Sequence, residues 1–291
     1  ITLDENVTED NIINIEESQN NIMITGTVTQ YAQVGDSVTL TVNDKVFTGS
    51  VQEGLIFAIL VPGADLIADS NSTIDAQVEV SDESASFVAN DSITYSVDTA
   101  IVGTPSVTIT QDDNNDGYIS STEISDTVNV LVTVGANTNI GDTLTITNLD
   151  ATQTDYEVTA EIIADGLLLE YANVEENADF SVNAQVTTAS GNISEVATST
   201  VTVDTQASNP VLIDAQNTTN SVNLTISIPE DANIGDILTV INPLGETVEY
   251  EVTEEMINSG FTVSYDSLTH GDTYEVSSFT TDSAGNVSET T

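Results

Sequence analysis

The chain has 291 residues, with 48 Asp and Glu against a single Lys or Arg, and its formal net charge is −47 at pH 7. So strong an excess of carboxylates excludes binding to nucleic acid and to anionic membrane surfaces, because both need clustered basic side chains. The sequence holds no cysteine, which excludes disulfides and thiolate metal ligands.

Hydrophobic residues make up 39% of the chain and are spread along it, so we expect folded domains rather than a disordered acidic tail. Repulsion among the carboxylates opposes compaction unless cations compensate it. Multivalent cations are therefore the expected partners, and adaptation to high salt is an alternative origin of the charge. No apolar run reaches the length of a membrane span, and we expect no insertion into a membrane.

One motif occurs three times along the chain. Its copies are "VGDSVTLTV" at 34–42, "IGDTLTITN" at 140–148 and "IGDILTVIN" at 234–242, so they start 106 and then 94 residues apart. The motif "SVDT" at 96–99 returns as "TVDT" at 202–205, again 106 residues later. Self-similarity at a fixed offset is the signature of tandem structural repeats.

A later motif supports the same division. The turn "ASGNISE" at 189–195 returns as "SAGNVSE" at 283–289, 94 residues on. We therefore predict three domains, at residues 1–98, 99–204 and 205–291. The chain opens in mid-pattern at "ITLD", and the third repeat ends before the counterpart of "TVDT". We expect a piece of a longer protein whose last strand is incomplete.

Within each repeat the apolar residues follow a period of two, as in "VNVLVTV", "TLTIT" and "FSVNAQV", and Gly, Asn and Asp cluster between these runs. The pattern predicts about seven short strands per repeat, which suits an immunoglobulin-like sandwich. The expected fold class is all-β, with three tandem immunoglobulin-like β-sandwich domains in an extended rod. "TAEIIADG" (159–166) and "TEEMINSG" (253–260) each predict one helical turn that ends at a glycine.

The first repeat opens with "NVTEDNIINIEE" (6–17), which keeps part of a twelve-residue calcium loop. Asp10, Asn14 and Glu17 stand at positions for oxygen ligands, while Asn11 stands where the loop has its glycine. With fewer charges, the segment predicts either a weaker calcium site or a turn that binds nothing.

The complete loop follows 106 residues later, in "DDNNDGYISSTE" (112–123), and its neighbours read as strands rather than helices. It matches the calcium consensus at every ligand position, and Gly117 allows the sharp turn between the ligands. So many hard oxygens suit calcium better than magnesium, and an Asx-rich surface turn is the alternative. The predicted ligands are Asp112, Asn114, Asp116, Tyr118 through its carbonyl, Ser120 and Glu123. The third repeat lacks such a loop.

Further acidic groups should meet where the repeats join. In an immunoglobulin-like sandwich the "GD" and "GN" turns lie at the end where the chain enters, beside the last residue of the preceding repeat. A calcium ion shared at each junction is one interpretation, and ordinary turn chemistry is the other. Thr188 stands where the third repeat has Asp282, so the second junction is the stronger candidate. The candidates are Asp98, Asp142 and Asn192 at the first junction, and Asp204, Asp236, Asp282 and Asn286 at the second.

The three repeats, with "DDNNDGYIS", "EDNIINIEES", "IGDTLTI", "SAGNVSE" and "TVDT", resemble the tandem bacterial immunoglobulin-like repeats of giant acidic adhesins. Gram-negative bacteria export these adhesins by type I secretion, and the class includes the Salmonella giant non-fimbrial adhesin and the repeat stalks of ice-binding and biofilm adhesins. The resemblance implies a secreted virulence or adhesion factor at the cell surface, built as a rod that calcium at the domain junctions stiffens. The third repeat lacks this loop, so the resemblance does not extend to a calcium site at the junction that would follow it.

The resulting hypothesis is a calcium-rigidified, non-enzymatic stalk segment of an adhesin, monomeric, whose partners are the neighbouring repeats of the same chain. A host-cell receptor or glycan would be reached through the full-length adhesin. The alternative is a receptor- or glycan-binding module of the adhesin tip, although Trp is absent and aromatic residues total 5%. We expect no enzyme activity, because the single His270 and the single Lys45 lie in turns without an oriented catalytic partner.

Overall fold

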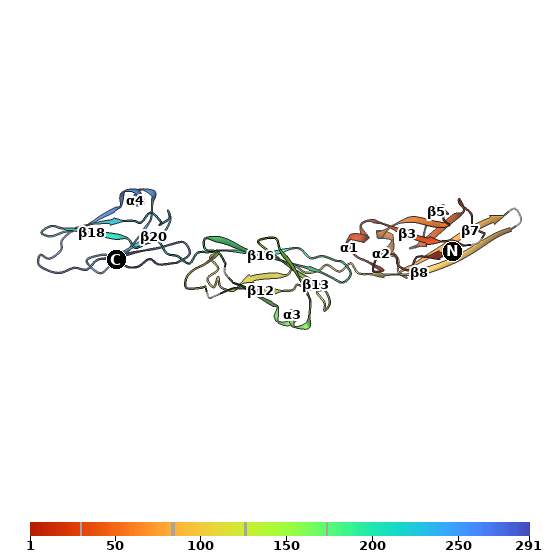
Figure 1. Cartoon of the computed structure of the whole chain (residues 1–291), viewed down its shortest axis with the longest axis horizontal. Helices are drawn as coiled ribbons and strands as arrows, with labels where there is room; N and C mark the ends of the chain where they lie inside the picture. Colours follow the sequence, from red (N-terminus) through yellow and green to blue (C-terminus); the bar gives the residue numbers. More distant parts are fainter. Residues whose placement is uncertain (30, 83–84, 125–126, 173) are drawn as a thin grey trace. The chain divides into compact units, whose positions relative to one another are not determined.

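The computed structural model describes residues 1–29, 31–82, 85–124, 127–172 and 174–291. Most of the regular structure in these ranges is short β-strand, and the helices among them have four to six residues (Figure 1). The all-β class predicted from the sequence is therefore confirmed. No helix in the described ranges is long and apolar enough to cross a membrane.

The elements follow the chain in this order. The first part contains β1 (Thr2–Leu3), β2 (Ile12–Ile13), α1 (Ile15–Ser18), β3 (Asn21–Thr27), β4 (Ser37–Val42), β5 (Lys45–Ser50), β6 (Ile56–Pro62), α2 (Gly63–Ala68), β7 (Thr73–Asp82), β8 (Ala85–Thr94) and β9 (Ser96–Val97). The middle part contains β10 (Ser106–Ile109), β11 (Tyr118–Ile119), β12 (Thr127–Thr133), β13 (Thr143–Asn148), β14 (Gln153–Glu157), α3 (Ala160–Asp165), β15 (Leu167–Ala172), β16 (Ala178–Thr187) and β17 (Ala197–Val203). The last part contains β18 (Leu212–Asn217), β19 (Val222–Ser227), β20 (Ile237–Ile241), β21 (Thr247–Glu251), α4 (Glu254–Ser259), β22 (Phe261–Tyr265) and β23 (Ser277–Thr281).

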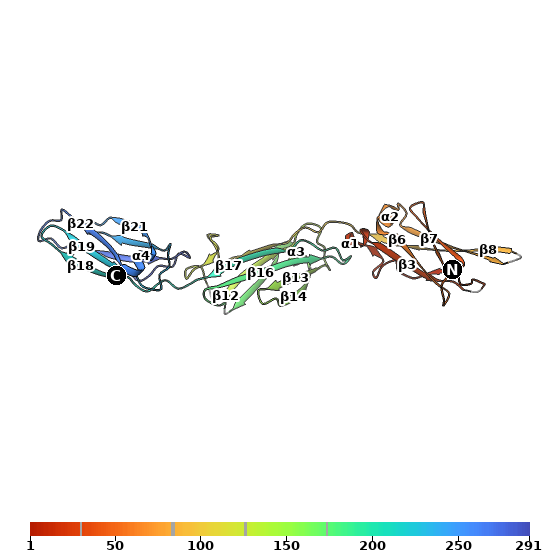
Figure 2. The same ribbon diagram turned by 90° about the horizontal axis from the view of Figure 1, so that it is seen from above.

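The sheets repeat along the chain as the sequence does. One kind of sheet has three strands and occurs as β1-β3-β6, as β10-β12-β15 and as β18-β19-β22, the last visible in Figure 2. The other kind contains the strand of the "GD" motif and occurs as β5-β4-β7-β8, as β11-β17-β16-β13-β14 and as β21-β20-β23. The sequence repeat is therefore also a repeat of strand connectivity.

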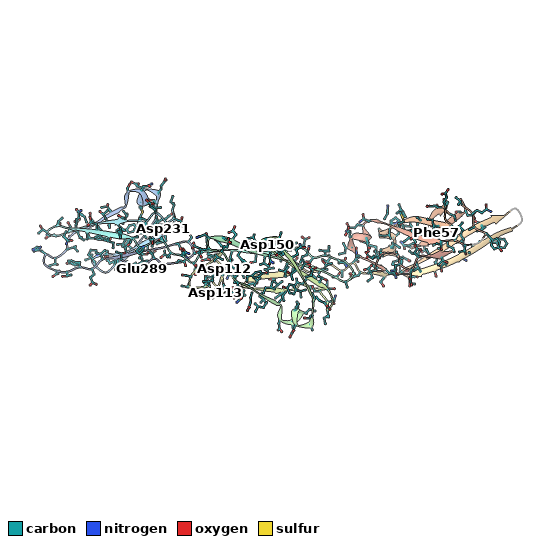
Figure 3. All side chains as sticks on the ribbon, viewed as in Figure 1. Phe57, Asp112, Asp113, Asp150, Asp231 and Glu289 are labelled. Atoms are coloured by element: carbon teal, nitrogen blue, oxygen red, sulfur yellow. The ribbon has the colours of Figure 1, made fainter. Side chains whose placement is uncertain are left out.

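The period of two in the sequence places alternate side chains in the core. Along β12, Val128, Val130 and Val132 are fully buried, and along β13 Leu144 and Ile146 are buried in the same alternation. Burying each such side chain contributes about 1.5–3 kcal/mol, which makes this alternation the main source of stability in the strands. In the first part of the chain a separate cluster packs around Phe57, labelled in Figure 3.

Both helical turns predicted from the sequence are confirmed. The hydroxyl of Thr159 accepts from a backbone N–H in the first turn of α3, and Gly166 ends that helix with φ of 82°. Thr253 and Gly260 do the same for α4, where the glycine has φ of 77°. The two glycines have ψ of 177° and 169°, and a positive φ with such a ψ is open almost only to glycine, so the glycine sets where each helix ends.

The chain divides into two compact units. Unit 1 consists of Ile1–Ser106, Val132–Leu167 and Asn183–Ala197. Unit 2 consists of Val107–Leu131, Leu168–Val182 and Thr198–Thr291. Each unit combines stretches of two predicted repeats, so the domain boundaries near residues 98 and 204 remain a prediction.

Candidate metal centres

The loop at residues 112–123 connects β10 to β12 and belongs to unit 2. Its Tyr118–Ile119 segment, β11, pairs in parallel with Thr202–Val203 at the end of β17. Asn115 and Gly117 have φ of 56° and 89°, left-handed conformations that Asn and Gly adopt at least cost. The chain therefore turns where the calcium consensus places its glycine, and Figure 3 labels Asp112 at the start of the loop.

The acidic and amide side chains of the loop turn back toward its own backbone. Asp112 accepts from the N–H of Asp116 (3.0 Å) through Oδ1 and from that of Gly117 (3.2 Å) through Oδ2. Asn114 Oδ1 also accepts from Asp116 N (2.9 Å), and Asp116 Oδ1 accepts from Tyr118 N (2.8 Å). A carboxylate oxygen has two lone pairs, so these bonds leave acceptor capacity for a cation at the same oxygens.

The backbone carbonyls of β11 settle which way the predicted carbonyl ligand points. Gly117 O accepts from Thr202 N (2.9 Å), and Ile119 O accepts from Asp204 N (3.1 Å). Successive carbonyls of a strand point to opposite sides, so the carbonyl of Tyr118, between these two, faces away from β17. The pairing with β17 therefore leaves the Tyr118 carbonyl available as a backbone ligand at the seventh position of the loop.

A hydrogen-bonded cap closes the end of the loop, and the weaker segment at 6–17 repeats it. Ser120 donates to Glu123 Oε2 from its backbone N (3.0 Å) and its hydroxyl (2.9 Å). In the same way Asn14 N donates to Glu17 Oε2 (3.1 Å), and Asn14 Oδ1 accepts from Glu17 N (2.9 Å). Asp10 accepts two hydrogen bonds inside its own turn. Capping and turn formation thus explain these three residues without an ion, and a metal there remains a prediction.

Unit 2 also holds an acidic pocket beside the end of β17. Its volume is about 320 Å³, enough for one cation with several waters, because a water takes ~30 Å³. Four aspartates line it: Asp204, Asp236 and Asp282, which the sequence placed at one junction, and Asp231, which it did not single out. Figure 3 labels Asp231.

Asp236 is the most deeply buried of these carboxylates. It is 2% exposed, and its Oδ2 accepts from Asn233 N (2.7 Å), whereas Oδ1 has no hydrogen-bond partner among the described residues. Burial, reinforced by the charge of Asp282, raises the pKa of Asp236. Burial and then Asp282 also raise the pKa of Asp204. A buried acceptor without a partner costs about 1–3 kcal/mol, and more when it is charged.

No basic side chain is free to compensate this pocket. The only Lys or Arg of the sequence is Lys45, which forms an ion pair with Asp65 in unit 1. His270 lines a different pocket. At the same time, no three Asp, Glu, His or Cys side chains in the described ranges are already arranged to hold a metal ion. A bound cation would therefore draw these carboxylates together.

The corresponding carboxylates in unit 1 are fully hydrogen-bonded. Asp98 Oδ2 accepts from the hydroxyl of Ser190 (2.6 Å), and its Oδ1 accepts from the N–H two residues later (3.1 Å). These bonds, the Ser190 hydroxyl first, lower the pKa of Asp98. Asp142, 3% exposed, accepts from Asn139 N (2.7 Å) and from Ala189 N (3.0 Å) through its two oxygens. Hydrogen bonds therefore stabilise the two carboxylates of Asp98 and Asp142 without an ion, and a shared metal ion there remains a prediction.

Two buried asparagines bind the backbone in the same way in the two units. In unit 1, Asn192 Oδ1 accepts from Ile15 N (2.8 Å) and Asn192 Nδ2 donates to Asp98 O (2.9 Å). In unit 2, Asn286 Oδ1 accepts from the backbone N of residue 121 (2.8 Å) and Nδ2 donates to Asp204 O (2.8 Å). Both side chains are 2% exposed. Asn286, predicted as a metal ligand, thus has both polar groups engaged by protein atoms.

One relevant difference escaped the sequence analysis. At the repeat offset of the two turns, Thr188 corresponds to Asp282, and Ser190 corresponds to Ala284. The Ser190 hydroxyl reaches Asp98, whereas Ala284 has no hydroxyl to offer. The signal was present in "TASGN" against "DSAGN", but a Ser-to-Ala difference carries no meaning until its acceptor is known.

Comparison with known proteins finds no matching family model and no matching curated protein. Among solved structures, the chain is similar to a Ca²⁺-stabilized adhesin with which an Antarctic bacterium binds ice, with a TM-score of 0.52 and 28% identity over 100% of this chain and 71% of the other. A 1.5-MDa bacterial ice-binding adhesin gives 0.44 and 24% over 98% and 93%. An immunoglobulin-like domain of the M. primoryensis ice-binding adhesin gives 0.31 and 32% over 33% and 93%.

The first of these similarities confirms the immunoglobulin-like β-sandwich class. It also supports the coarse part of the family resemblance, a likeness to the repeats of a bacterial adhesin. The likeness to the Salmonella adhesin remains a prediction.

Proposed function

We propose that this chain is a repeat segment of a large bacterial surface adhesin, a non-enzymatic stalk that calcium stiffens. Its similarity to an ice-binding bacterial adhesin along the whole chain supports the adhesin assignment. We further propose that the protein is exported by type I secretion and lies on the surface of a Gram-negative cell. The full-length protein would contact a host receptor or glycan. The direct partners of this segment are the neighbouring repeats of the same chain.

The calcium part of the proposal rests on one observation above all, the unpartnered Oδ1 of buried Asp236. The pocket around it holds Asp204 and Asp282, and the sequence has no basic side chain to spare for it. A hard dication bound by oxygen ligands would give Oδ1 a partner and offset the repulsion. The fit is one of chemistry, since carboxylates are the ligands that calcium prefers in proteins.

The loop at residues 112–123 supports a second calcium ion. Asp112, Asn114 and Asp116 turn their oxygens back toward the loop, and the carbonyl of Tyr118 faces away from β17. Glu123 is held at the closing end by Ser120, with its Oε2 already oriented. The loop therefore supplies the oxygen-bearing residues that the consensus assigns, which supports a calcium ion here by chemistry.

Calcium bound in the pocket and in the loop would make the stability of the fold differ between the inside and the outside of the cell. Extracellular calcium modules bind with Kd on the order of 10⁻⁴–10⁻³ M. A ligand that binds only the folded form stabilises it by about 2.7 kcal/mol when its concentration is a hundred times Kd. The acidic chain would thus stay loosely folded inside the cell, where calcium is scarce, and become rigid after export.

The loop can be tested with Asp116→Ala combined with Glu123→Ala in the full chain. We expect calorimetry to find one calcium ion fewer per chain, while amide exchange in residues 205–291 shows that this part stays folded. Asp113→Ala is the matched control, since it removes a charge from the same loop at a position that the consensus does not use. Equal calcium stoichiometry in the double variant and the unmodified chain would contradict the assignment.

A further inference from the structure

The Asp98 set (Asp98, Asp142, Thr188 and Ser190) and the Asp204 set (Asp204, Asp236, Asp282 and Ala284) occupy the same places in successive repeats. Resting on the proposed function, we propose that two positions decide how the negative charge of each set is stabilised. These positions are residues 188 and 190 in the Asp98 set and residues 282 and 284 in the Asp204 set. In the Asp98 set, hydrogen bonds stabilise two carboxylates and no calcium is bound, whereas the Asp204 set carries a third carboxylate at Asp282 and an unpartnered oxygen at Asp236, and a calcium ion stabilises it.

In the Asp98 set each carboxylate oxygen already has a donor. Ser190 donates its hydroxyl to Asp98 (2.6 Å) and is itself within hydrogen-bond distance of the Thr188 hydroxyl (2.8 Å). Thr188 also accepts from Asn192 N (3.0 Å), so the two hydroxyls form one chain of hydrogen bonds that ends on Asp98. The backbone N–H of Ala189 meets Asp142 Oδ1. Charge-assisted bonds of this kind stabilise the ionised carboxylates without a metal.

In the Asp204 set the same positions supply charge instead of donors. Asp282 replaces the threonine, and its two oxygens accept from Asn286 N (2.8 Å) and Asn286 Nδ2 (3.0 Å). Ala284 replaces the serine and offers no hydroxyl to Asp204, whose carboxylate accepts among the described residues one long contact, from Gln206 N (3.4 Å). Asp236 Oδ1, the counterpart of the Asp142 oxygen that accepts from Ala189 N, has no partner in the part of the chain that the structure describes.

The asparagine side chains make the same backbone contacts in both sets, while Asn192 Nδ2 also donates to Ser190 Oγ and Asn286 Nδ2 also donates to Asp282. Asn192 holds the Asp98 carbonyl and Ile15 N, and Asn286 holds the Asp204 carbonyl and Ser121 N. These backbone contacts are therefore independent of the ion. The sets differ at the two exchanged residues and in the backbone N–H of the turn, which reaches Asp142 Oδ1 in the Asp98 set, whereas Asp236 Oδ1 has no partner among the described residues.

The consequence is a chain with one permanent and one calcium-dependent connection. Removing calcium would leave the contacts around Asp98 intact in unit 1. In unit 2 it would expose Asp204, Asp236 and Asp282 to their mutual repulsion, opposed only by the Asn286 contacts. The structure around the Asp98 set would then be the same with and without calcium, whereas the structure around the Asp204 set would change when calcium is removed.

A reciprocal exchange tests this assignment in the full chain. Asp282→Thr with Ala284→Ser should lose one bound calcium ion, and Thr188→Asp with Ser190→Ala should gain one, both measured by equilibrium dialysis in millimolar calcium. Asp214→Thr, which removes one exposed carboxylate from β18 outside the pocket, is the control and should bind as the unmodified chain does. In EDTA the Asp282→Thr, Ala284→Ser variant should also melt at a higher temperature than the unmodified chain.

The outcomes separate this inference from the proposed function. If the unmodified chain binds no calcium, the proposed function fails. If it binds calcium but the Asp282→Thr, Ala284→Ser variant binds the same number of ions, the two-residue assignment is wrong. A folded Thr188→Asp, Ser190→Ala variant without an additional ion would also overturn it. Should that second variant not fold, the first variant and its melting in EDTA still decide the question.

Discussion

Replacing Asp236 with Asn should change stability in opposite directions with and without calcium. Asn has nearly the shape of Asp, so its carbonyl can keep the hydrogen bond from Asn233 N while its amide group takes the place of Oδ1. Without calcium, the change removes a buried charge beside Asp282 and places a donor toward the neighbouring carboxylates. One net hydrogen bond is worth about 1 kcal/mol, so the variant should be more stable than the unmodified chain by on the order of this amount.

With calcium, the variant loses a ligand and the sign reverses. The unmodified chain gains about 2.7 kcal/mol when calcium is a hundred times Kd, and a variant that no longer binds at this pocket gains none of it. For a cooperative unit of about 100 residues, 1 kcal/mol shifts Tm by about 4–8 °C. After the gain of about 1 kcal/mol is subtracted, the variant should be about 1.7 kcal/mol less stable in saturating calcium and melt about 7–14 °C below the unmodified chain, whereas in EDTA it should melt about 4–8 °C above it.

The assay is calorimetric melting of the full chain in EDTA and in ~10 mM calcium, about a hundred times the tighter Kd expected for extracellular sites. Amide exchange of unit 2 identifies the transition that belongs to the pocket. Asp214→Asn, on the exposed side of β18, is the control and should give small differences of the same sign in both buffers. A variant at Asp236 that is less stable than the unmodified chain in both buffers would refute the reasoning.

Two further predictions concern acidity and the buried asparagines. In EDTA the raised pKa values of Asp204 and Asp236 give unit 2 a contribution that is fully present below the ordinary carboxyl pKa and is lost as pH rises through the raised values. The lowered pKa of Asp98 gives unit 1 the opposite dependence, present above the ordinary value and lost as pH falls through the lowered one, and amide exchange of each unit across acidic pH checks both signs. Asn192→Ala and Asn286→Ala each remove two buried hydrogen bonds to backbone groups, so each should cost about 1–3 kcal/mol in urea unfolding, with and without calcium. A cost for Asn192→Ala that appears only in calcium would contradict the metal-free role of this residue.

The strands and helical turns were predictable because local patterns determine them. The alternation in "VNVLVTV" reappears as the buried Val128, Val130 and Val132 of β12, and Thr159 with Gly166 marks both ends of α3. Because the repeats share these patterns, one well-read repeat predicts the others. Helices α1 and α2 were not predicted, since four to six residues carry too little periodicity to be recognised.

Whether the carboxylates of each acidic site have hydrogen-bond donors was less predictable. Asp142 and Asp236 lie in the same "IGD" motif, yet only the Asp142 carboxylate meets a backbone N–H from the turn that follows β16. Whether a given N–H reaches a given oxygen depends on tertiary packing, which the motif does not encode. The repeat offset predicted that Asp204, Asp236 and Asp282 lie together, and they line one pocket. It did not predict the hydrogen bond from Ser190 to Asp98.

The central claim is that calcium stiffens this chain, and small-angle X-ray scattering of the same sample in calcium and then in excess EDTA tests it most directly. The account predicts that chelation shortens the longest dimension and broadens the distribution of interatomic distances. It further predicts that the Asp282→Thr, Ala284→Ser variant responds less to chelation, because its hydroxyls replace the ion. Identical scattering profiles before and after chelation would contradict the claim.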